Sequence, residues 1–331
     1  MSQLISILAV TFPIFALVLC GYVATRRGTL PVSAIPGLSS YILSFALPAL
    51  LFRMGMAIPI RELLDGPLLL VYLICALTLA GLTLVFSRNA RVGLHDAAFG
   101  GLVAVYPNAG FMGIPLLAAL IGDISARVII LTVLVDCFVI ISLCLAIVQL
   151  PESGDKKGIF GMLIRAFLAA FRGALANPLP WPIAAGVLLG AIGVTLPEPV
   201  NKAIGMLSDT ASPVALFTIG AILARNAVSA TRGNPPIDYV PVALTKLLVH
   251  PVLVYGVGRA VQALGFALDD PALIALTLVA ALPPAINVTM LAERFGADAG
   301  RIARIIMLAT VLSFVSFTVA VWLLGVRPPG A

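Results

Sequence analysis

Residues 47–55 read LPALLFRMG, and residues 212–220 read SPVALFTIG, so a proline, a leucine, a phenylalanine and a glycine recur with the same spacing 165 positions apart. Working outward, Gly21 precedes the first block and Gly190 precedes the second, at an offset of 169. One short gap therefore aligns the two halves of the chain. If each half crosses a membrane an odd number of times, the second copy is inverted relative to the first. Inverted repeats are typical of secondary transporters.

The composition indicates an all-α polytopic membrane protein. Of the 331 residues, 61% are hydrophobic and 10% are charged. An apolar stretch of about 17–25 residues can cross the hydrocarbon core as a helix. Ten stretches have about this length, and they leave little sequence for a soluble domain: Leu4–Ala24, Pro36–Arg53, Pro67–Ser87, Ala97–Ile121, Val128–Leu150, Pro178–Leu196, Ile204–Ala224, Val240–Ala263, Ala272–Ala292 and Ala303–Leu324.

The longest polar connection separates the two halves. We expect a first five-helix repeat over residues 1–150, a cytoplasmic linker over 151–177 and a second five-helix repeat over 178–331. The later part of the linker, Ile159–Leu175, is amphipathic. It fits either a helix that lies on the membrane surface or a simple apolar linker.

The basic residues predict the topology. Thirteen of the twenty lysines and arginines fall in the loops on one side, six fall on the other, and Lys246 lies within a predicted span. The positive-inside rule assigns the richer side to the cytoplasm and both termini to the outside. The basic excess thus follows from topology, and we expect the lipid bilayer, not a nucleic acid, to be the partner it reflects.

Two predicted spans contain sequences that break a helix. Residues 105–115 read VYPNAGFMGIP in the fourth span, and residues 281–288 read ALPPAINV in the ninth. Proline lacks an amide donor and clashes with the preceding turn. A broken helix is tolerated in a membrane only where protein or a water-filled cavity surrounds it. A packing kink could explain either segment alone, but breaks in matching positions of two halves point to a transport site. The candidate substrate-binding residues are Pro107, Asn108, Gly110, Pro283, Pro284, Ile286 and Asn287.

Two ionisable residues lie deep within predicted spans. Asp136 is midway along the fifth span, and Lys246 is well inside the eighth. Such groups cost several kcal/mol to insert and usually face a cavity or a partner. They could pair with each other, or couple a proton or a cation to transport. The structural alternatives are a hydrogen-bond anchor for Asp136 and a snorkelling stem for Lys246. His250, one turn after Lys246, is expected to be a packing residue.

Other classes of function lack their usual residues. The four cysteines form no Cys-x-x-Cys pair, so no metal site or disulfide framework is expected. The two histidines, His95 and His250, belong to no His-Glu-x-x-His motif, which disfavours an intramembrane enzyme. No cofactor is expected beyond a coupling ion, H⁺ or Na⁺. A channel remains an alternative, which saturating flux and counterflow would separate from a carrier.

The two asparagine segments resemble the auxin efflux carrier family. Its bacterial members are often described as malonate or dicarboxylate transporters, and its plant members export auxin. The resemblance covers essentially the whole chain, including residues 213–217 and 246–252. The long cytoplasmic loop of the plant carriers is absent, so auxin itself is not implied.

The resemblance implies a specific architecture. It implies ten helices in two inverted five-helix repeats, similar to the sodium/proton antiporter and bile-acid symporter folds, with helices four and nine crossing at their breaks. Helices one, two, six and seven would form a scaffold, often dimeric. Helices three to five and eight to ten would form a transport bundle that moves like an elevator. Asn108 and Asn287 match the crossover asparagines that contact substrate, and Pro107 with Pro283 or Pro284 would make the breaks.

The expected function is therefore secondary active transport of a small organic anion, malonate- or auxin-like, by alternating access. The expected location is a cell membrane, in particular a bacterial inner membrane. The alternative is a sodium-coupled carrier of bile-acid-like or other amphipathic acids.

Overall fold

The computed structural model describes residues 2–59, 65–122, 124–149, 179–229 and 235–327, together with six isolated positions between 161 and 175. Within those ranges the chain is helical and contains no β-strand, which confirms the all-α prediction. The predicted linker over 151–177 lies outside the described residues except at those six positions.

Seven helical stretches among the described residues are long and apolar enough to cross a membrane. Four are single α-helices, and three are pairs of α-helices joined through a π turn. They are α1 (Ser2–Arg26), α2 with α3 (Ile35–Tyr41 and Leu47–Ala57), α5 (Gly66–Ser87), α8 with α9 (Ile124–Val135 and Ile141–Val148), α12 (Glu198–Ser229), α13 with α14 (Val240–Leu244 and His250–Ala263) and α17 (Ala299–Leu323).

The other three predicted spans correspond to shorter helices. The fourth is interrupted between α6 (Leu94–Val105) and α7 (Ile114–Ile121), and the ninth between α15 (Asp270–Ala281) and α16 (Val288–Arg294). Both interruptions contain the prolines at which the sequence predicted a break. The sixth predicted span is the single helix α11 (Pro180–Ala191), which has 12 residues.

Four π turns interrupt the described helices, and three of them have a common cause. Those at Ile42–Ala46, Ala109–Gly113 and Thr245–Val249 are each followed, at the second residue after the turn, by a proline. Because proline has no amide to donate, a wider turn before it accommodates the missing bond. The fourth π turn, Asp136–Ile140, has no proline after it. Since π turns often mark functional sites, this one draws attention to Asp136.

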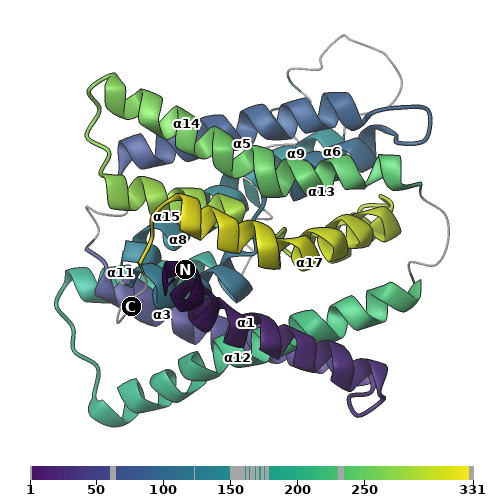
Figure 1. The fold of residues 1–331 in the computed structure, drawn as a ribbon. Coiled ribbons are helices and arrows are strands. Elements are labelled where there is room, and N and C mark those ends of the chain that lie inside the picture. The colour runs from purple at the N-terminus through teal and green to yellow at the C-terminus, as the bar shows by residue number, and fades with distance from the viewer. Residues whose placement is uncertain are drawn as a thin grey trace.

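Four helices pack closely through glycines on one side of the molecule, where Figure 1 shows α1, α3, α11 and α12 together. A Cβ atom at Gly21 would overlap the carbonyl oxygen of Phe217, and one at Gly220 would overlap that of Val18. These contacts join α1 to α12. The same kind of approach joins α3 to α11, at Gly55 and Gly190. Only a residue without a side chain allows backbones to come this close.

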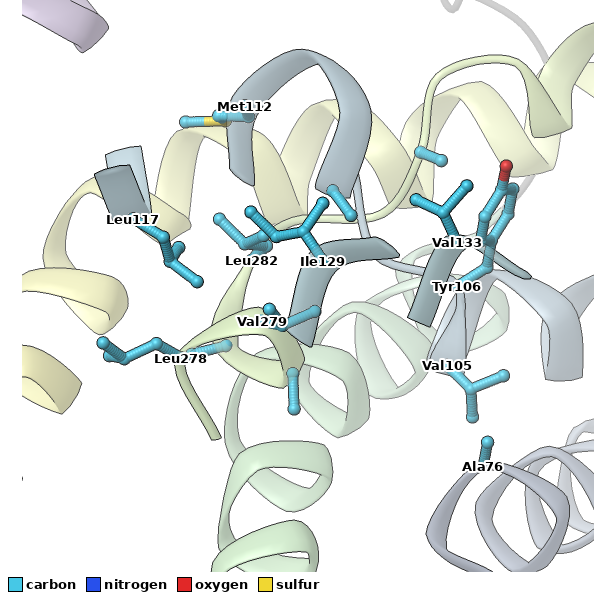
Figure 2. Packing of buried hydrophobic residues seen from close by; sticks show 14 of the residues in the cluster. Ala76, Val105, Tyr106, Met112, Leu117, Ile129, Val133, Leu278, Val279 and Leu282 are labelled. Atoms are coloured by element: carbon cyan, nitrogen blue, oxygen red, sulfur yellow. The ribbon is translucent and has the colours of Figure 1, made fainter. Parts of the chain in front are cut away.

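The broken helices lie in the most buried part of the protein. Figure 2 shows residues from both sides of the first break, and from the segment that precedes the second, packing around α8; Met112, Ile129 and Leu282 are all fully buried. The irregular backbone at each break is therefore enclosed by protein, the condition under which it is tolerated at membrane depth.

Candidate functional site

The two breaks meet and satisfy each other's backbone. Pro107 and Pro284 form an antiparallel β-bridge. The amide of Asn108 donates to the carbonyl oxygen of Pro283 at 2.8 Å, and the amide of Ala285 donates to that of Tyr106 at 3.1 Å. Backbone groups that each helix loses at its break thus find partners in the other break. The segments 106–108 and 283–285 form one rigid crossover.

Both predicted asparagines face a common cavity at this crossover. Asn108, Asn287, Pro107 and Gly110 line a cavity of about 40 Å³. The Asn287 amide nitrogen donates to the Tyr106 hydroxyl at 3.3 Å. The Asn108 side chain is 4% exposed and makes no hydrogen bond to another described residue. An asparagine amide in that state can donate to a ligand that enters the cavity.

The remaining predicted residues take other places. Pro283 and Pro284 build the crossover without lining this cavity. Ile286 lines a larger cavity of about 720 Å³, between α2 and α12 on one side and α16 and α17 on the other. Leu43 lines both cavities, so they are adjacent. The larger one is also lined by Arg225 and Glu293.

Asp136 lies in a fully buried polar group next to the crossover. The Tyr72 hydroxyl donates to Asp136 Oδ1 at 2.7 Å, and both side chains have no exposed area. Asp136 Oδ2 is also buried and has no hydrogen-bond partner among the described residues. Tyr72 was missed by sequence reasoning because it is one aromatic residue within an apolar span.

Lys246 bonds to the carbonyl ends of both broken helices. Its ammonium donates to the carbonyl oxygen of Ala280, near the end of α15, at 3.0 Å, and to that of Val105, the last residue of α6, at 3.5 Å. Its third contact is His250 Nδ1 at 2.9 Å. Lys246 and His250 are completely buried. His250 is thus a polar partner and not simply a packing residue.

Asp136 and Lys246 do not bond to each other. The described residues contain five ion pairs within 4.0 Å, and none includes Lys246. The direct Asp136–Lys246 pair, which the sequence left open, is not formed. Instead there are two neighbouring polar pairs, Tyr72–Asp136 and Lys246–His250, and the ring centroids of Tyr72 and His250 lie 6.5 Å apart.

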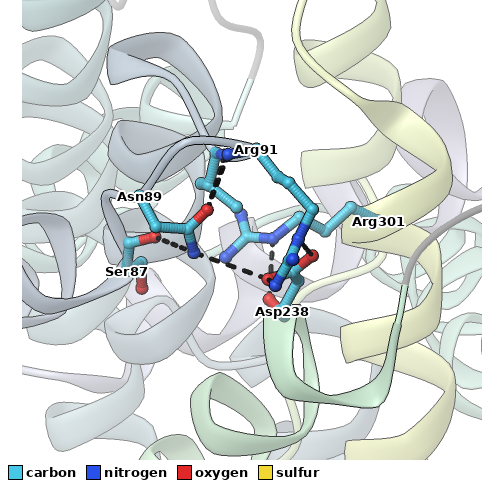
Figure 3. Close-up of polar contacts among 6 residues, drawn as sticks. Ser87, Asn89, Arg91, Asp238 and Arg301 are labelled. Carbon is cyan, nitrogen blue, oxygen red and sulfur yellow. Dashed lines mark hydrogen bonds and ion pairs between the residues drawn. The ribbon is translucent and has the colours of Figure 1, made fainter.

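An arginine cluster lies at each end of α5. At one end, Arg127 Nη2 lies 3.2 Å from both oxygens of Asp269, and Nη1 lies 4.0 Å from Asp65 Oδ2. At the other, Arg301 donates to the carbonyl oxygens of Asp238 and Asp96, each at 2.8 Å. Figure 3 shows this second cluster. We call them the Arg127 cluster and the Arg301 cluster.

Asp238 holds the outer part of the Arg301 cluster together. Arg91 Nε donates to Asp238 Oδ2 at 3.0 Å, and Asn89 donates to Oδ1 at 3.5 Å (Figure 3). The hydrogen bond from Arg91 lowers the pKa of the Asp238 carboxyl below its ordinary value of 3.8. The carboxylate form is thus favoured in the folded protein.

Within the described residues, seven helical stretches long and apolar enough to span a membrane, and two broken helices that meet next to asparagines, indicate a multi-pass membrane protein of the transporter class. The family described as "Membrane transport protein" matches residues 6–323, and the chain belongs to this family. The resemblance to the auxin efflux carriers is confirmed, since this chain is 21% identical over 263 residues to "Auxin efflux carrier component 8" of Arabidopsis thaliana, covering 66% of this chain and 72% of that one.

Two bacterial relatives extend over almost the whole chain. The "Putative malonate transporter" of Rhizobium meliloti (strain 1021) is 28% identical over 324 residues, which cover 96% of each protein. The "Uncharacterized transporter YfdV" of Escherichia coli (strain K12) is 26% identical over 318 residues, covering 94% of this chain and 95% of that one. The family and these relatives are transporters and not enzymes.

Proposed function

We propose that this protein is a secondary active transporter that carries a small organic anion, a malonate-like dicarboxylate, by alternating access. The observation that carries the proposal is the crossover, where Asn108 and Asn287 from the two broken helices line one buried cavity. The name of the Rhizobium relative supports a dicarboxylate as the cargo.

The chemistry of the crossover suits a carboxylate. Side-chain amides of asparagine donate hydrogen bonds to anionic oxygens, and the side-chain amide of Asn108 has no partner among the described residues. Helical segments begin immediately after each asparagine, so their amino-terminal ends, which carry partial positive charge, lie at the cavity. The enclosed site has little water to compete for these donors.

We further propose ten spans arranged as two inverted five-helix repeats. The glycine contacts support this arrangement, because aligning the two repeats superposes the contact between one pair of helices on the contact between the other pair. It relates Gly21 to Gly190 and Gly55 to Gly220, so the α1–α12 contact becomes the α3–α11 contact. The β-bridge between Pro107 and Pro284 fits a two-fold axis that passes between the broken helices.

The proposed moving parts follow the same division. Helices α1, α2 with α3, α11 and α12 are the scaffold, through which a homodimer would form. The other helices are the transport bundle, which moves against the scaffold as an elevator, and the cavity of about 720 Å³ lies between the two groups. The distribution of arginines and lysines supports a cytoplasmic position for this cavity and outside positions for both termini. The proposed location is a cell membrane, in particular a bacterial inner membrane.

Asp136 and Lys246 are the proposed coupling or charge-partner residues, with H⁺ or Na⁺ as the coupling ion. Their complete burial beside the crossover supports a role in transport, because buried ionisable groups in membranes usually serve one. The relatives give no support to the alternative of a sodium-coupled carrier of bile-acid-like acids. A channel stays the second alternative, and flux that fails to saturate would favour it.

Transport into proteoliposomes tests the proposal. Uptake and counterflow of malonate should saturate, and Asn108→Ala or Asn287→Ala should weaken binding by about 1–3 kcal/mol, or about 5–150-fold, because a polar partner is lost in a buried site. Asn201, which is exposed at the start of α12, provides the matched control, and Asn201→Ala should transport normally. Normal transport by both crossover variants would refute the assigned site.

A further inference from the structure

We propose that Lys246 is a built-in cation that takes the place of a free sodium ion at the crossover, so that transport by this protein does not require sodium. The inference rests on the proposed function, because it concerns the coupling of that transport. It concerns a position that broken-helix transporters use for cations: the carbonyl ends of half-helices coordinate the coupling ion there.

The Lys246 ammonium bonds to the carbonyl ends of two helices. The last carbonyls of a helix have no partner within the helix and carry partial negative charge. Lys246 donates to the carbonyl oxygens of Val105 and Ala280, so one ammonium neutralises the ends of α6 and α15 together. These two oxygens come from different halves of the chain. A membrane interior offers no water that could replace this contact.

All three N–H donors of the Lys246 ammonium have partners. A lysine ammonium has three donors, and Lys246 has three partners, two carbonyl oxygens and His250 Nδ1. Since the charged ammonium cannot accept, Nδ1 must accept the bond and Nε2 carries the ring proton. The described partners therefore leave no donor of Lys246 free for a carboxylate, and none lies within 4.0 Å of it. Lys246 is bound to helix ends and not to an acidic side chain.

Without the Lys246 ammonium, the groups left at this position would be mainly oxygen atoms. Hard cations such as sodium prefer oxygen ligands, as do the calcium and magnesium ions of proteins. The carbonyl oxygens of Val105 and Ala280 would lose a donor, and the buried Asp136 Oδ2 already lacks one. The other polar or ionisable groups around this centre are Tyr72, Tyr106, Cys137 and His250. Removal of the Lys246 side chain would thus leave two backbone oxygens without this donor, next to the centre that holds the Asp136 carboxyl.

The experiment compares wild type with Lys246→Ala and Lys246→Arg in proteoliposomes, using malonate counterflow in sodium or choline chloride on both sides of the membrane. Wild-type rates should agree within about twofold in the two salts. Lys246→Ala should lose at least about tenfold in choline and regain activity saturably with sodium or lithium. Lys246→Arg, which keeps the charge, should stay independent of sodium. Lys202→Ala, an exposed lysine on α12, is the matched control and should behave like wild type.

A second readout needs no substrate. The thermal unfolding midpoint of detergent-solubilised protein should not change with sodium for wild type, and should rise with sodium for Lys246→Ala. The proposal would be overturned if sodium activated or stabilised the wild-type protein saturably. Full activity of Lys246→Ala in choline would also overturn it. So would a folded Lys246→Ala protein that sodium neither stabilises nor reactivates. If Lys246→Ala does not fold, the wild-type sodium titration decides. If wild type moves no malonate in either salt, the proposed function fails, and the thermal test still addresses Lys246.

Discussion

The Arg127 cluster and the Arg301 cluster have the same plan in different surroundings. Each arginine lies in the first turn of a helix, α8 or α17, and the two are 174 positions apart. Each contacts the aspartate before a helix of its own half, Asp65 or Asp238, and an aspartate at the start of a broken helix of the other half, Asp269 or Asp96. Both aspartate pairs are separated by 173 positions. This agreement is what two inverted repeats would produce.

The difference lies in what each guanidinium touches. The Arg127 side chain is 15% exposed and binds carboxylates, one of which, on Asp269, is 51% exposed. Arg301 is 2% exposed and donates to two backbone carbonyl oxygens. Each guanidinium also has one buried nitrogen without a described partner, Nε of Arg127 and Nη2 of Arg301. A buried donor that is removed leaves its acceptors unpaired, whereas water replaces an exposed one. The comparison therefore predicts unequal costs for equivalent substitutions.

Arg301→Met should produce the larger loss of stability. The substitution keeps much of the apolar stem but removes the buried side-chain donor from the carbonyl oxygens of Asp96 and Asp238, which we expect to cost about 2–5 kcal/mol. The measurement is the thermal unfolding midpoint in detergent. Arg88→Met, an exposed arginine at the same end of α5, is the control and should leave the midpoint unchanged. A stable Arg301→Met protein would mean that relaxation or water satisfies these carbonyls.

Arg127→Met should cost less, about 1 kcal/mol or below, because its nearer partner, the Asp269 carboxylate, is 51% exposed and can bind water instead. Its effect should also shrink as salt is added, since exposed charges are screened within about 10 Å at 0.1 M ionic strength. The cost of Arg301→Met should not respond to salt. Equal costs for the two substitutions would break the comparison and show that burial is not what separates the clusters.

The sequence predicted the parts of this protein that depend on local chemistry. Prolines at 107, 283 and 284 identify the breaks because a missing amide disrupts a helix wherever it occurs. The aligned glycines Gly21 and Gly190 were visible as a repeat, but their close backbone contacts were not. Helix length was predicted less well, since the predicted span at 178–196 is the short helix α11.

The partners of the charged residues could not be read from the sequence, because they come from distant segments. Lys246 was recognised as a buried cation, yet its acceptors are backbone oxygens, which no side-chain pattern marks. Tyr72 lies 64 positions from Asp136 in an apolar stretch without any other signal. Arg301 counted only as one of the basic residues that set the topology, although its side chain is buried.

The smallest expected effect is the pH dependence of the stability that the Arg301 cluster contributes. It tests the contribution of the Asp238 charge independently of the backbone contacts of Arg301. The hydrogen bond from Arg91 lowers the pKa of Asp238 below its ordinary value of 3.8. A lowered folded-state pKa contributes stability above the ordinary value, and this contribution is lost as the pH falls through the folded pKa. Wild type should therefore unfold at a slightly higher temperature than Arg91→Gln near neutral pH.

This advantage of wild type should disappear when the pH is lowered well below 3.8, because Asp238 is then protonated in both proteins. Thermal unfolding in detergent across that range measures it, with Arg88→Gln as the control that should show no pH-dependent difference. A difference that persists at low pH would mean that the Arg91 side chain stabilises the loop by packing. The charge of Asp238 would then add nothing, and the contrast between the two clusters would rest on the buried contacts of Arg301 alone.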